Sequence, residues 1–211
     1  MTLNLKDGPL TENTLAALKQ QERDARRRLI LDAARDLFAE KDFRSVTVRE
    51  IARAAGISIG TIYNYYENLT ELFLDVFLKS ADDLLARIDQ AAAGAGHPLN
   101  ELCRLYIDFL QENMAFYQMM GHFMLGGDLS ERGTEKLNQK MRALMDRIEA
   151  AVKDGGHQPD SRLMAHGLFS ALNGIMITYA RYPGRNADEI SRHTRRLAEL
   201  IGDAFKTYAA V

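Results

Sequence analysis

Residues 51–63 of the chain read IARAAGISIGTIY. A helix-turn-helix needs a glycine where the turn takes a positive φ, small residues where its two helices touch, and an exposed polar or aromatic face on the second helix. Gly56 can supply the turn, and Ala52 and Ala55 allow the close approach. The stretch therefore predicts a helix-turn-helix.

The flanking sequence carries helix-start signals on both sides of this stretch. Apolar residues recur at helical spacing upstream and predict a first helix over about residues 22–40. Thr47 and Glu50 form a capping-box pattern that predicts the start of a second helix, and Ser58 is suited to cap a third. Asn68, followed three residues later by a glutamate, predicts the start of a long helix that links two parts of the chain.

The rest of the chain also has a helical pattern. Clusters of turn-forming residues divide it at residues 94–98, 126–127, 154–159 and 183–184. No alternation typical of strands occurs, so the predicted fold class is all-α with roughly nine helices. We expect a small three-helix domain over residues 22–67 and a larger helical domain over residues 68–211.

Composition limits the class of protein. The chain has 211 residues, of which 46% are hydrophobic and 27% charged, as in ordinary globular proteins. No secretion signal and no run of about eighteen apolar residues occurs, so we expect a cytoplasmic protein. Cys103 is the single cysteine, which excludes an internal disulfide and a cysteine-based zinc site. Its apolar neighbours predict a small buried side chain without thiol chemistry.

Charge is unevenly distributed along the sequence. The formal net charge is −2, yet basic residues gather in the first third, and the chain beyond residue 66 is net acidic. This asymmetry suits a nucleic-acid-binding part joined to a part with another role. A solvated helix face explains the run Arg26 to Arg28 equally well.

Residues 25 to 75 resemble the TetR family of bacterial repressors. The resemblance rests on the segments LILDAA (29–34), LF (37–38), TVREIA (47–52), AGIS (55–58), GTIY (60–63) and YENLTEL (66–72). The remainder is similar to the family only in length and helix number. The resemblance implies that Tyr66 packs inward and that a helix-turn-helix faces double-stranded DNA. The DNA-binding residues that we predict are Thr47, Arg49, Ser58, Thr61, Tyr63, Asn64 and Tyr65.

Three positions depart from the common family pattern. Asp42 replaces a glycine after the first helix, and aspartate can adopt the left-handed conformation. Leu69 stands where a phosphate-binding lysine is frequent, so that anchor is missing. Asn64 occupies a variable readout position: its amide either binds adenine in a bidentate manner or is an ordinary solvated side chain, and both interpretations stay open.

The middle of the chain is rich in aromatic residues and methionines, which line adaptable apolar cavities well. The resemblance places the pocket for a small-molecule inducer among these helices, and the lining predicts an apolar or aromatic inducer. The predicted ligand-binding residues are Phe77, Tyr106, Phe116, Tyr117, Met120, His122, Phe123, Met124, Met145, Phe169, Asn173 and Met176. Tyr106, His122 and Asn173 are the candidate orienting groups. For each residue, simple core packing is the alternative.

The last two helical segments, residues 163–179 and 190–208, combine small residues with a wide apolar stripe. Such helices can pack closely, and internal packing is one explanation. The resemblance implies that they form a homodimer through a four-helix bundle around a two-fold axis. The larger domain is then a ligand-binding and dimerisation domain, and the helix from Asn68 couples it to the DNA-binding domain.

Catalysis finds no support in the sequence. The five histidines are not paired with an acid or a cysteine at a familiar spacing, and no nucleophile elbow, phosphate-binding loop or zinc-protease motif occurs. We therefore expect a ligand-responsive repressor that uses no metal and no cofactor. The alternatives are a helical enzyme that uses His122 or His166, which lie in apolar stretches, and a DNA-packaging protein without sequence specificity.

Overall fold

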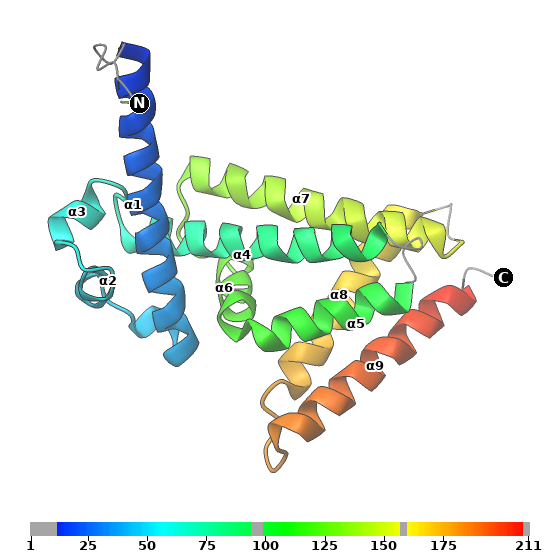
Figure 1. The fold of residues 1–211 in the computed structure, drawn as a ribbon. Helices are drawn as coiled ribbons and strands as arrows, with labels where there is room; N and C mark the ends of the chain where they lie inside the picture. The colour runs from blue at the N-terminus through cyan, green and yellow to red at the C-terminus, as the bar shows by residue number, and fades with distance from the viewer. Residues whose placement is uncertain (1–11, 94–98, 157–159, 209–211) are drawn as a thin grey trace, which may run out of the picture. The chain divides into compact units, whose positions relative to one another are not determined.

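The computed structural model of the protein describes residues 12–93, 99–156 and 160–208. Over these residues the chain forms nine α-helices and one short 3-10 helix, with no strand, which confirms the all-α fold class (Figure 1). It divides into two compact units between Leu72 and Phe73. The predicted turn at 94–98 and part of that at 154–159 lie outside the described residues.

The first unit is built on a helix that is longer than the sequence pattern predicts. α1 spans Glu12–Glu40, whereas periodicity indicated a start near residue 22. Residues 12–22 contain no glycine or proline and many good helix formers, so the backbone continues as helix without an apolar face. Leu15 and Leu18 accordingly lie 44% and 48% exposed. Periodicity marks where a helix gains packing neighbours, and the helix itself extends beyond that point.

A small apolar core joins α1 to the 3-10 helix η1 (Phe43–Ser45), α2 (Val48–Ala54) and α3 (Ile59–Tyr63). Its residues include Ile30, Phe38, Phe43, Ile51 and Ile62, all at most 4% exposed. The rings of Phe38 and Phe43 meet edge to face, with centroids 6.2 Å apart.

Short-range hydrogen bonds fix the helix starts of this unit as the sequence predicts. Thr47 and Glu50 form the capping box of α2, and the Ser58 hydroxyl accepts the backbone N–H of Thr61 at the start of α3. Gly56 has a φ of +66°, as the turn requires. Asn68 caps α4 (Leu69–Ala92), its side-chain oxygen accepting the Glu71 N–H at 2.9 Å.

The expectation of a left-handed Asp42 is wrong. Asp42 has φ −53° and ψ 124°, and its carboxylate accepts the backbone N–H of Arg44 at 2.9 Å, capping η1. The same carboxylate forms an ion pair with the Arg44 guanidinium at 2.8 Å. The usual glycine is therefore replaced by a residue that begins a new helical turn through its side chain.

The second unit contains the remainder of α4 and five further helices. The clusters of turn-forming residues in the sequence predicted only four helices after α4. α5 (Leu99–Glu112) and α6 (Met114–Met124) are separated only by Asn113. The Asn113 amide donates to the carbonyl oxygen of Phe109 at 2.9 Å, and the residue has φ −122° and ψ 58°. An asparagine side chain that binds the last turn of a helix can end it without glycine or proline, which is why the break was missed.

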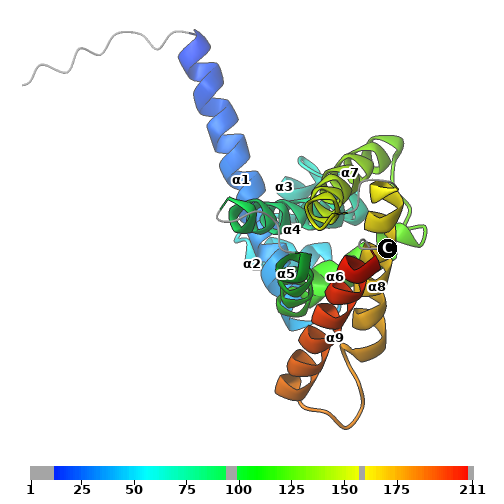
Figure 2. The same cartoon turned by 90° about the vertical axis from the view of Figure 1, so that its right-hand side faces the viewer.

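α5 lies antiparallel to α9 (Ala187–Tyr208), as Figures 1 and 2 show. Three polar contacts join the two helices at intervals: Asn100 to Asp203 at 2.6 Å, Asp108 to Arg195 at 2.5 Å, and Gln111 to Thr194 at 2.7 Å. Gly202 permits the close approach, because a Cβ there would lie 2.3 Å from the Asn100 side-chain oxygen.

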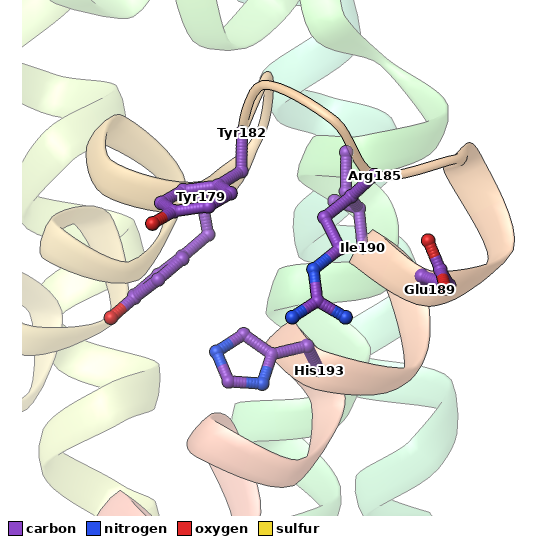
Figure 3. Close-up of a pocket in the computed structure, with 6 residues that line it drawn as sticks. All are labelled: Tyr179, Tyr182, Arg185, Glu189, Ile190 and His193. Atoms are coloured by element: carbon purple, nitrogen blue, oxygen red, sulfur yellow. The ribbon is translucent and has the colours of Figure 1, made fainter.

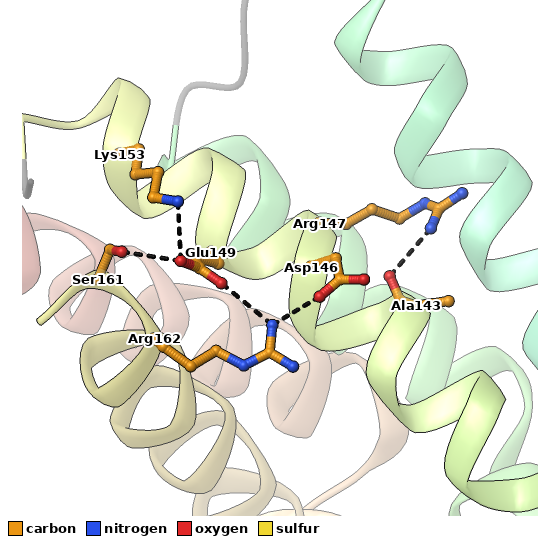
Figure 4. Close-up of polar contacts among 7 residues, drawn as sticks. All are labelled: Ala143, Asp146, Arg147, Glu149, Lys153, Ser161 and Arg162. Carbon is orange, nitrogen blue, oxygen red and sulfur yellow. Dashed lines mark hydrogen bonds and ion pairs between the residues drawn. The ribbon is translucent and has the colours of Figure 1, made fainter.

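α7 (Glu131–Asp154) is held to α8 (Ser161–Tyr179) by a polar network around Glu149 (Figure 4). The Glu149 carboxylate binds Lys153 at 2.8 Å, Ser161 at 2.9 Å and Arg162 at 3.1 Å, and Arg162 also binds Asp146 at 2.7 Å. These contacts, with that of Lys153 first, lower the pKa of Glu149 to about 2.

Ion pairs also link α7 to α4. They join Asp75 to Lys136, Asp82 to Lys140 and Asp89 to Arg147. The three aspartates are spaced by seven residues, so they lie on one face of α4.

Within the described part of the chain, no helix is both long and apolar enough to cross a membrane.

Candidate DNA-binding surface, second-unit core and exposed helix face

The helix α3 presents polar side chains to the outside of the first unit. Tyr63 is 52% exposed, and Asn64 is exposed as well. Within the described residues, neither side chain makes a hydrogen bond, whereas the hydroxyls of Ser58 and Thr61 bind each other at 2.9 Å. Tyr65 is half-buried, and Tyr66 is buried at 5% exposure, as the resemblance implied for Tyr66.

The start of α2 adds one cation to this surface. Arg49 is exposed and forms no ion pair with a described carboxylate. The Thr47 hydroxyl is 2.8 Å from the Glu50 carboxylate, so it is already engaged in the capping box. Lys41 binds Glu50 at 2.6 Å and, with the Thr47 contacts, lowers the pKa of Glu50 to about 2. The carboxylate therefore stays charged and holds the start of α2.

Two arginines of α1 join this surface, and sequence reasoning did not include them among the site residues. The Arg23 guanidinium lies over the ring of Tyr65, 5.8 Å from its centroid. Arg27 donates through Nε to the Tyr66 hydroxyl at 3.3 Å. Only folding brings these residues together, because about forty positions separate the arginines from the tyrosines. The surface can thus offer hydrogen-bond donors and positive charge to an anionic partner.

Aromatic rings in the second unit pack against one another across three helices. Phe77 of α4 stacks on Phe116 of α6, with centroids 4.7 Å apart and planes within 4°. Phe123 meets Phe77 edge to face at 5.6 Å, and Phe109 of α5 meets Phe116 at 5.4 Å. These four rings form a buried aromatic cluster at the centre of the unit.

A polar group lies beside the aromatic cluster. The Asn173 amide donates to the Tyr106 hydroxyl at 3.1 Å and to the carbonyl oxygen of Phe169 at 2.8 Å. The Tyr117 hydroxyl donates to the Asn173 carbonyl oxygen at 3.2 Å, and that of Tyr106 lies 3.9 Å from the Met120 sulfur. Burial raises the pKa of Tyr106, so its hydroxyl remains protonated. Hydrogen-bonding capacity is therefore concentrated at one point of an apolar interior.

The predicted ligand-binding residues all lie in the second unit, and all but two of them are buried or half-buried. The buried ones are Phe77, Tyr106, Phe116, Met120, Phe123, Met145 and Met176. Tyr117, Phe169 and Asn173 are partly exposed. Met124 is 54% exposed and His122 is exposed, its ring 5.3 Å from that of Phe123. Of the proposed orienting groups, Tyr106 and Asn173 are in contact, and His122 is not part of their network.

The other candidate reactive side chains are dispersed. His166 and His193 are exposed on α8 and α9, while His97 and His157 lie outside the described residues. Over the residues that the structure describes, no three acidic, histidine or cysteine side chains gather as a metal site would require. Cys103 is fully buried in α5, as expected, and burial raises the pKa of its thiol to about 12.

α8 and α9 expose an apolar face. Leu163 is 69%, Ile177 80% and Leu200 64% exposed. A Cβ at Gly174 would meet nothing within 4 Å, whereas at Gly167 it would touch the Phe205 ring of α9 at 3.6 Å. Gly167 therefore approaches α9 of the same chain, whereas the half-buried Gly174 has no neighbour at its Cβ position. Large exposed apolar side chains in such a group mark an interaction surface.

Comparisons with known proteins assign the helix-turn-helix of the first unit to a family. The family described as "Bacterial regulatory proteins, tetR family" matches residues 30–76, which include the helix-turn-helix. The HTH-type transcriptional repressor KstR2 of Rhodococcus jostii is 32% identical over 147 residues, covering 65% of this chain and 71% of KstR2. The repressor KstR of Mycolicibacterium smegmatis is 26% identical over 197 residues, covering 92% of this chain and 94% of KstR.

A solved structure shares the fold. The Bacillus subtilis transcriptional regulator FadR, in complex with stearoyl-CoA, superimposes with a TM-score of 0.66 at 18% identity, over 82% of this chain and 96% of FadR. With the sequence matches, this assigns a class: the chain belongs to the tetR family of bacterial regulatory proteins and is a helix-turn-helix transcriptional regulator.

Proposed function

We propose that the protein is a homodimeric repressor that binds a palindromic DNA site and is released from it by a small, mainly apolar molecule. The observation that carries the proposal is the outer surface of the first unit. Tyr63, Asn64 and Arg49 are exposed there without hydrogen-bond partners among the described residues. Tyr63 and Asn64 lie at the end of α3, the second helix of the helix-turn-helix, which suits a major groove, and Arg49 adds a cation from α2.

Roles divide within this surface. Tyr63 and Arg49 suit phosphate oxygens, which fix the position of the protein on the duplex. Asn64 lies beside Tyr63 at the end of α3, and its amide suits the N6 and N7 edge of adenine. Ser58, Thr61 and Tyr65 complete the surface around them, and the capping hydrogen bond of Thr47 holds the start of α2 in place.

The exposed face of α8 and α9 supports a dimer. Leu163, Ile177 and Leu200 are apolar and mostly exposed, and the open position at Gly174 leaves room for a second helix pair. Two copies related by a two-fold axis would present two recognition helices, so the bound site should contain two related half-sites. The first unit then reads DNA over residues 22–67, and residues 68–211 bind the ligand and the second copy.

The interior of the second unit supports an apolar ligand. Its aromatic and methionine side chains surround the Tyr106–Asn173 pair, which can fix the orientation of a molecule that displaces the packing. FadR, a protein of the same fold, is in complex with stearoyl-CoA, so this fold can accommodate a ligand with a long apolar chain. His122 and Met124 would take part at the outer edge of such a site.

Release requires a difference in affinity between two states. α4 begins in the first unit at Leu69 and continues into the second, where Phe77 belongs to the aromatic cluster. A ligand that binds better when α4 is shifted would lower DNA affinity by that difference in binding free energy.

The first experiment selects bound fragments from random double-stranded DNA and compares a selected duplex with a scrambled one at physiological salt. Tyr63→Ala should weaken binding to both, and Asn64→Ala should reduce discrimination at one base pair by about 1–3 kcal/mol. Tyr182→Ala is the matched control, because Tyr182 is 46% exposed and lies in the second unit. Equal affinity for selected and scrambled duplexes would identify a DNA-packaging protein instead of a repressor.

A further inference from the structure

A pocket lies where α8 ends and α9 begins, away from the aromatic cluster (Figure 3). Its volume is about 160 Å³. The lining residues are Tyr179, Tyr182, Arg185, Glu189, Ile190 and His193. A cavity of about 150 Å³ is large enough to hold one benzene ring, so this pocket suits a ligand with a single six-membered ring.

Aromatic side chains form one wall of the pocket. The rings of Tyr179 and Tyr182 lie 5.7 Å apart with planes inclined by 31°, and His193 meets Tyr179 edge to face at 4.8 Å. Ile190 adds an apolar surface from α9. A flat ring can stack or pack edge to face against such a wall.

Three polar side chains of the pocket, those of Arg185, Tyr179 and Tyr182, have no hydrogen-bond or ion-pair partner among the described residues. Figure 3 shows the Arg185 guanidinium directed toward His193. Arg185 pairs with no described carboxylate, and the hydroxyls of Tyr179 and Tyr182 make no hydrogen bond with a described residue. Glu189 also lines the pocket, but its carboxylate accepts the Asn186 backbone N–H at 3.0 Å. An unpaired guanidinium is suited to a carboxylate, which it can bind through two parallel hydrogen bonds.

A neighbouring hollow is a weaker candidate. It has a volume of about 710 Å³ and shares Tyr182, Arg185 and Ile190 with the pocket. Its remaining charged groups include Asp108 and Arg195, which bind each other at 2.5 Å. Arg181 and Asp188 also line this hollow, so opposite charges are mixed there and favour no single sign of ligand.

We propose that the pocket at the α8–α9 corner is a second ligand site, which binds a small aromatic carboxylate. The carboxylate pairs with Arg185, and the ring packs against Tyr179, Tyr182 and Ile190, with His193 extending the aromatic wall. The surrounding charge favours an anion, since residues 181–196 contain two acidic residues and four arginines without an ion pair among the described residues, Arg195 being paired with Asp108. The residues that line this pocket belong neither to the DNA-binding surface nor to the aromatic cluster.

The test measures binding of benzoate to the full chain by calorimetry, together with NMR shifts of the Ile190 methyl groups. For nine non-hydrogen atoms we expect a Kd on the order of 1 mM or below. Arg185→Gln should raise that Kd by about tenfold or more, as should replacing benzoate by the neutral isostere benzamide. Arg192→Gln is the matched control, because Arg192 is exposed, lies beside His193 and does not line the pocket.

Each other outcome contradicts the proposal. It is overturned if benzoate shows no saturable binding at about tenfold above the expected Kd, or if Arg185→Gln and Arg192→Gln affect binding equally. If cyclohexanecarboxylate binds as tightly as benzoate, the claim that the pocket prefers an aromatic ring is wrong. Loss of benzoate binding in Met120→Trp, with Arg185→Gln unaffected, would move the site to the aromatic cluster.

Discussion

The contacts inside the first unit and those inside the second differ in the sequence separation of the residues that they join. In the first unit, each of α2, α3 and α4 is fixed by a hydrogen bond between residues three apart, and the packed apolar core is small. In the second unit α7 and α9 begin with caps of the same kind, but the contacts that join α5 to α9 connect residues separated by 83 to 103 positions. Tyr106 and Asn173, which form the polar group of the interior, are 67 positions apart.

This difference suits the two roles that we propose. Local caps allow the first unit to keep a fixed outer surface while its polar side chains stay free for DNA. Helices that depend on distant side chains can shift against one another when a ligand changes the packing between them. The first unit should therefore tolerate substitutions in the second, and the reverse, unless they change the dimer or the ligand site.

The largest effect should come from Gly174→Glu, which tests whether the second unit has an outward interface. A Cβ at Gly174 has no neighbour within 4 Å, so the side chain can be accommodated in the single chain. At a packed helix crossing between two copies, a buried charge should weaken the dimer by about 3 kcal/mol, or roughly 100-fold.

Light scattering and sedimentation measure this change. Gly121→Glu is the control, because Gly121 is also a helical glycine without a neighbour within 4 Å, but lies on α6. A Gly174→Glu protein that stays dimeric and binds DNA normally would place the interface elsewhere.

Met120→Trp tests whether a ligand cavity forms in the interior of the second unit. Met120 is 4% exposed and contacts Tyr106. If a ligand cavity forms there, the larger side chain should abolish ligand-induced release of DNA and leave DNA affinity and melting temperature nearly unchanged. In a close-packed core it should instead destabilise the unit by roughly 1–3 kcal/mol.

The exposed Met124 of the same helix provides the control, since Met124→Trp has room to project into solvent. A large loss of thermal stability in Met120→Trp, without selective loss of release, would contradict the ligand site at this residue.

Gly202→Ala tests the long-range contacts directly. The added methyl group would lie 2.3 Å from the side-chain oxygen of Asn100, and the amide nitrogen of the same side chain donates a hydrogen bond to Asp203 that holds it in place. We expect α5 and α9 to separate slightly, at a cost of about 1–2 kcal/mol in the free energy of unfolding.

Gly174→Ala is the comparison variant, since it should gain helix propensity without a clash. Asn100→Ala should restore stability to Gly202→Ala in chemical denaturation. If both glycine variants unfold at the same denaturant concentration, the close approach of α5 and α9 has no energetic role.

Arg23→Ala tests whether α1 takes part in DNA binding. Its guanidinium lies over Tyr65, a predicted DNA contact. Loss of one phosphate contact in each half-site should reduce the slope of log affinity against log salt concentration by about 2.

Gel shifts over a range of salt concentrations measure that slope. Arg26→Ala serves as the control, because Arg26 is paired with Glu22 at 2.6 Å on the same helix. Identical slopes for the wild type and Arg23→Ala would remove α1 from the DNA surface.

The smallest expected effect is the loss of folding stability as the pH is lowered. Glu50 and Glu149 lie in different units, and the pKa of each is lowered from 4.5 to about 2. Their contributions to stability should be complete above about pH 4.5 and be lost as the pH falls toward 2, because protonation breaks the ion pairs.

Thermal unfolding between these pH values should show a decline that is smaller in Glu50→Gln and in Glu149→Gln. Glu101→Gln, at an exposed position without a described partner, should follow the wild type. A decline of the same size in all four proteins would contradict the assignment.

Much of the first unit could be predicted because its signals are local. Gly56 adopts the positive φ that the turn requires, and Thr47, Ser58 and Asn68 cap the helices that follow them. The start of α1 could not be predicted from periodicity, because residues 12–22 form helix without an apolar face. Asp42 was misjudged, since its side chain caps η1 where a left-handed backbone was expected.

The helical fold class, the helix-turn-helix and its caps follow from local sequence patterns, since these depend on residues within a few positions of one another. Which distant side chains meet depends on the packing of the helices. It placed Arg23 on Tyr65, joined Tyr106 to Asn173, separated His122 from that pair, and formed the pocket around Arg185. Such contacts depend on how helices pack along their whole length, and periodicity in one helix does not specify its neighbour.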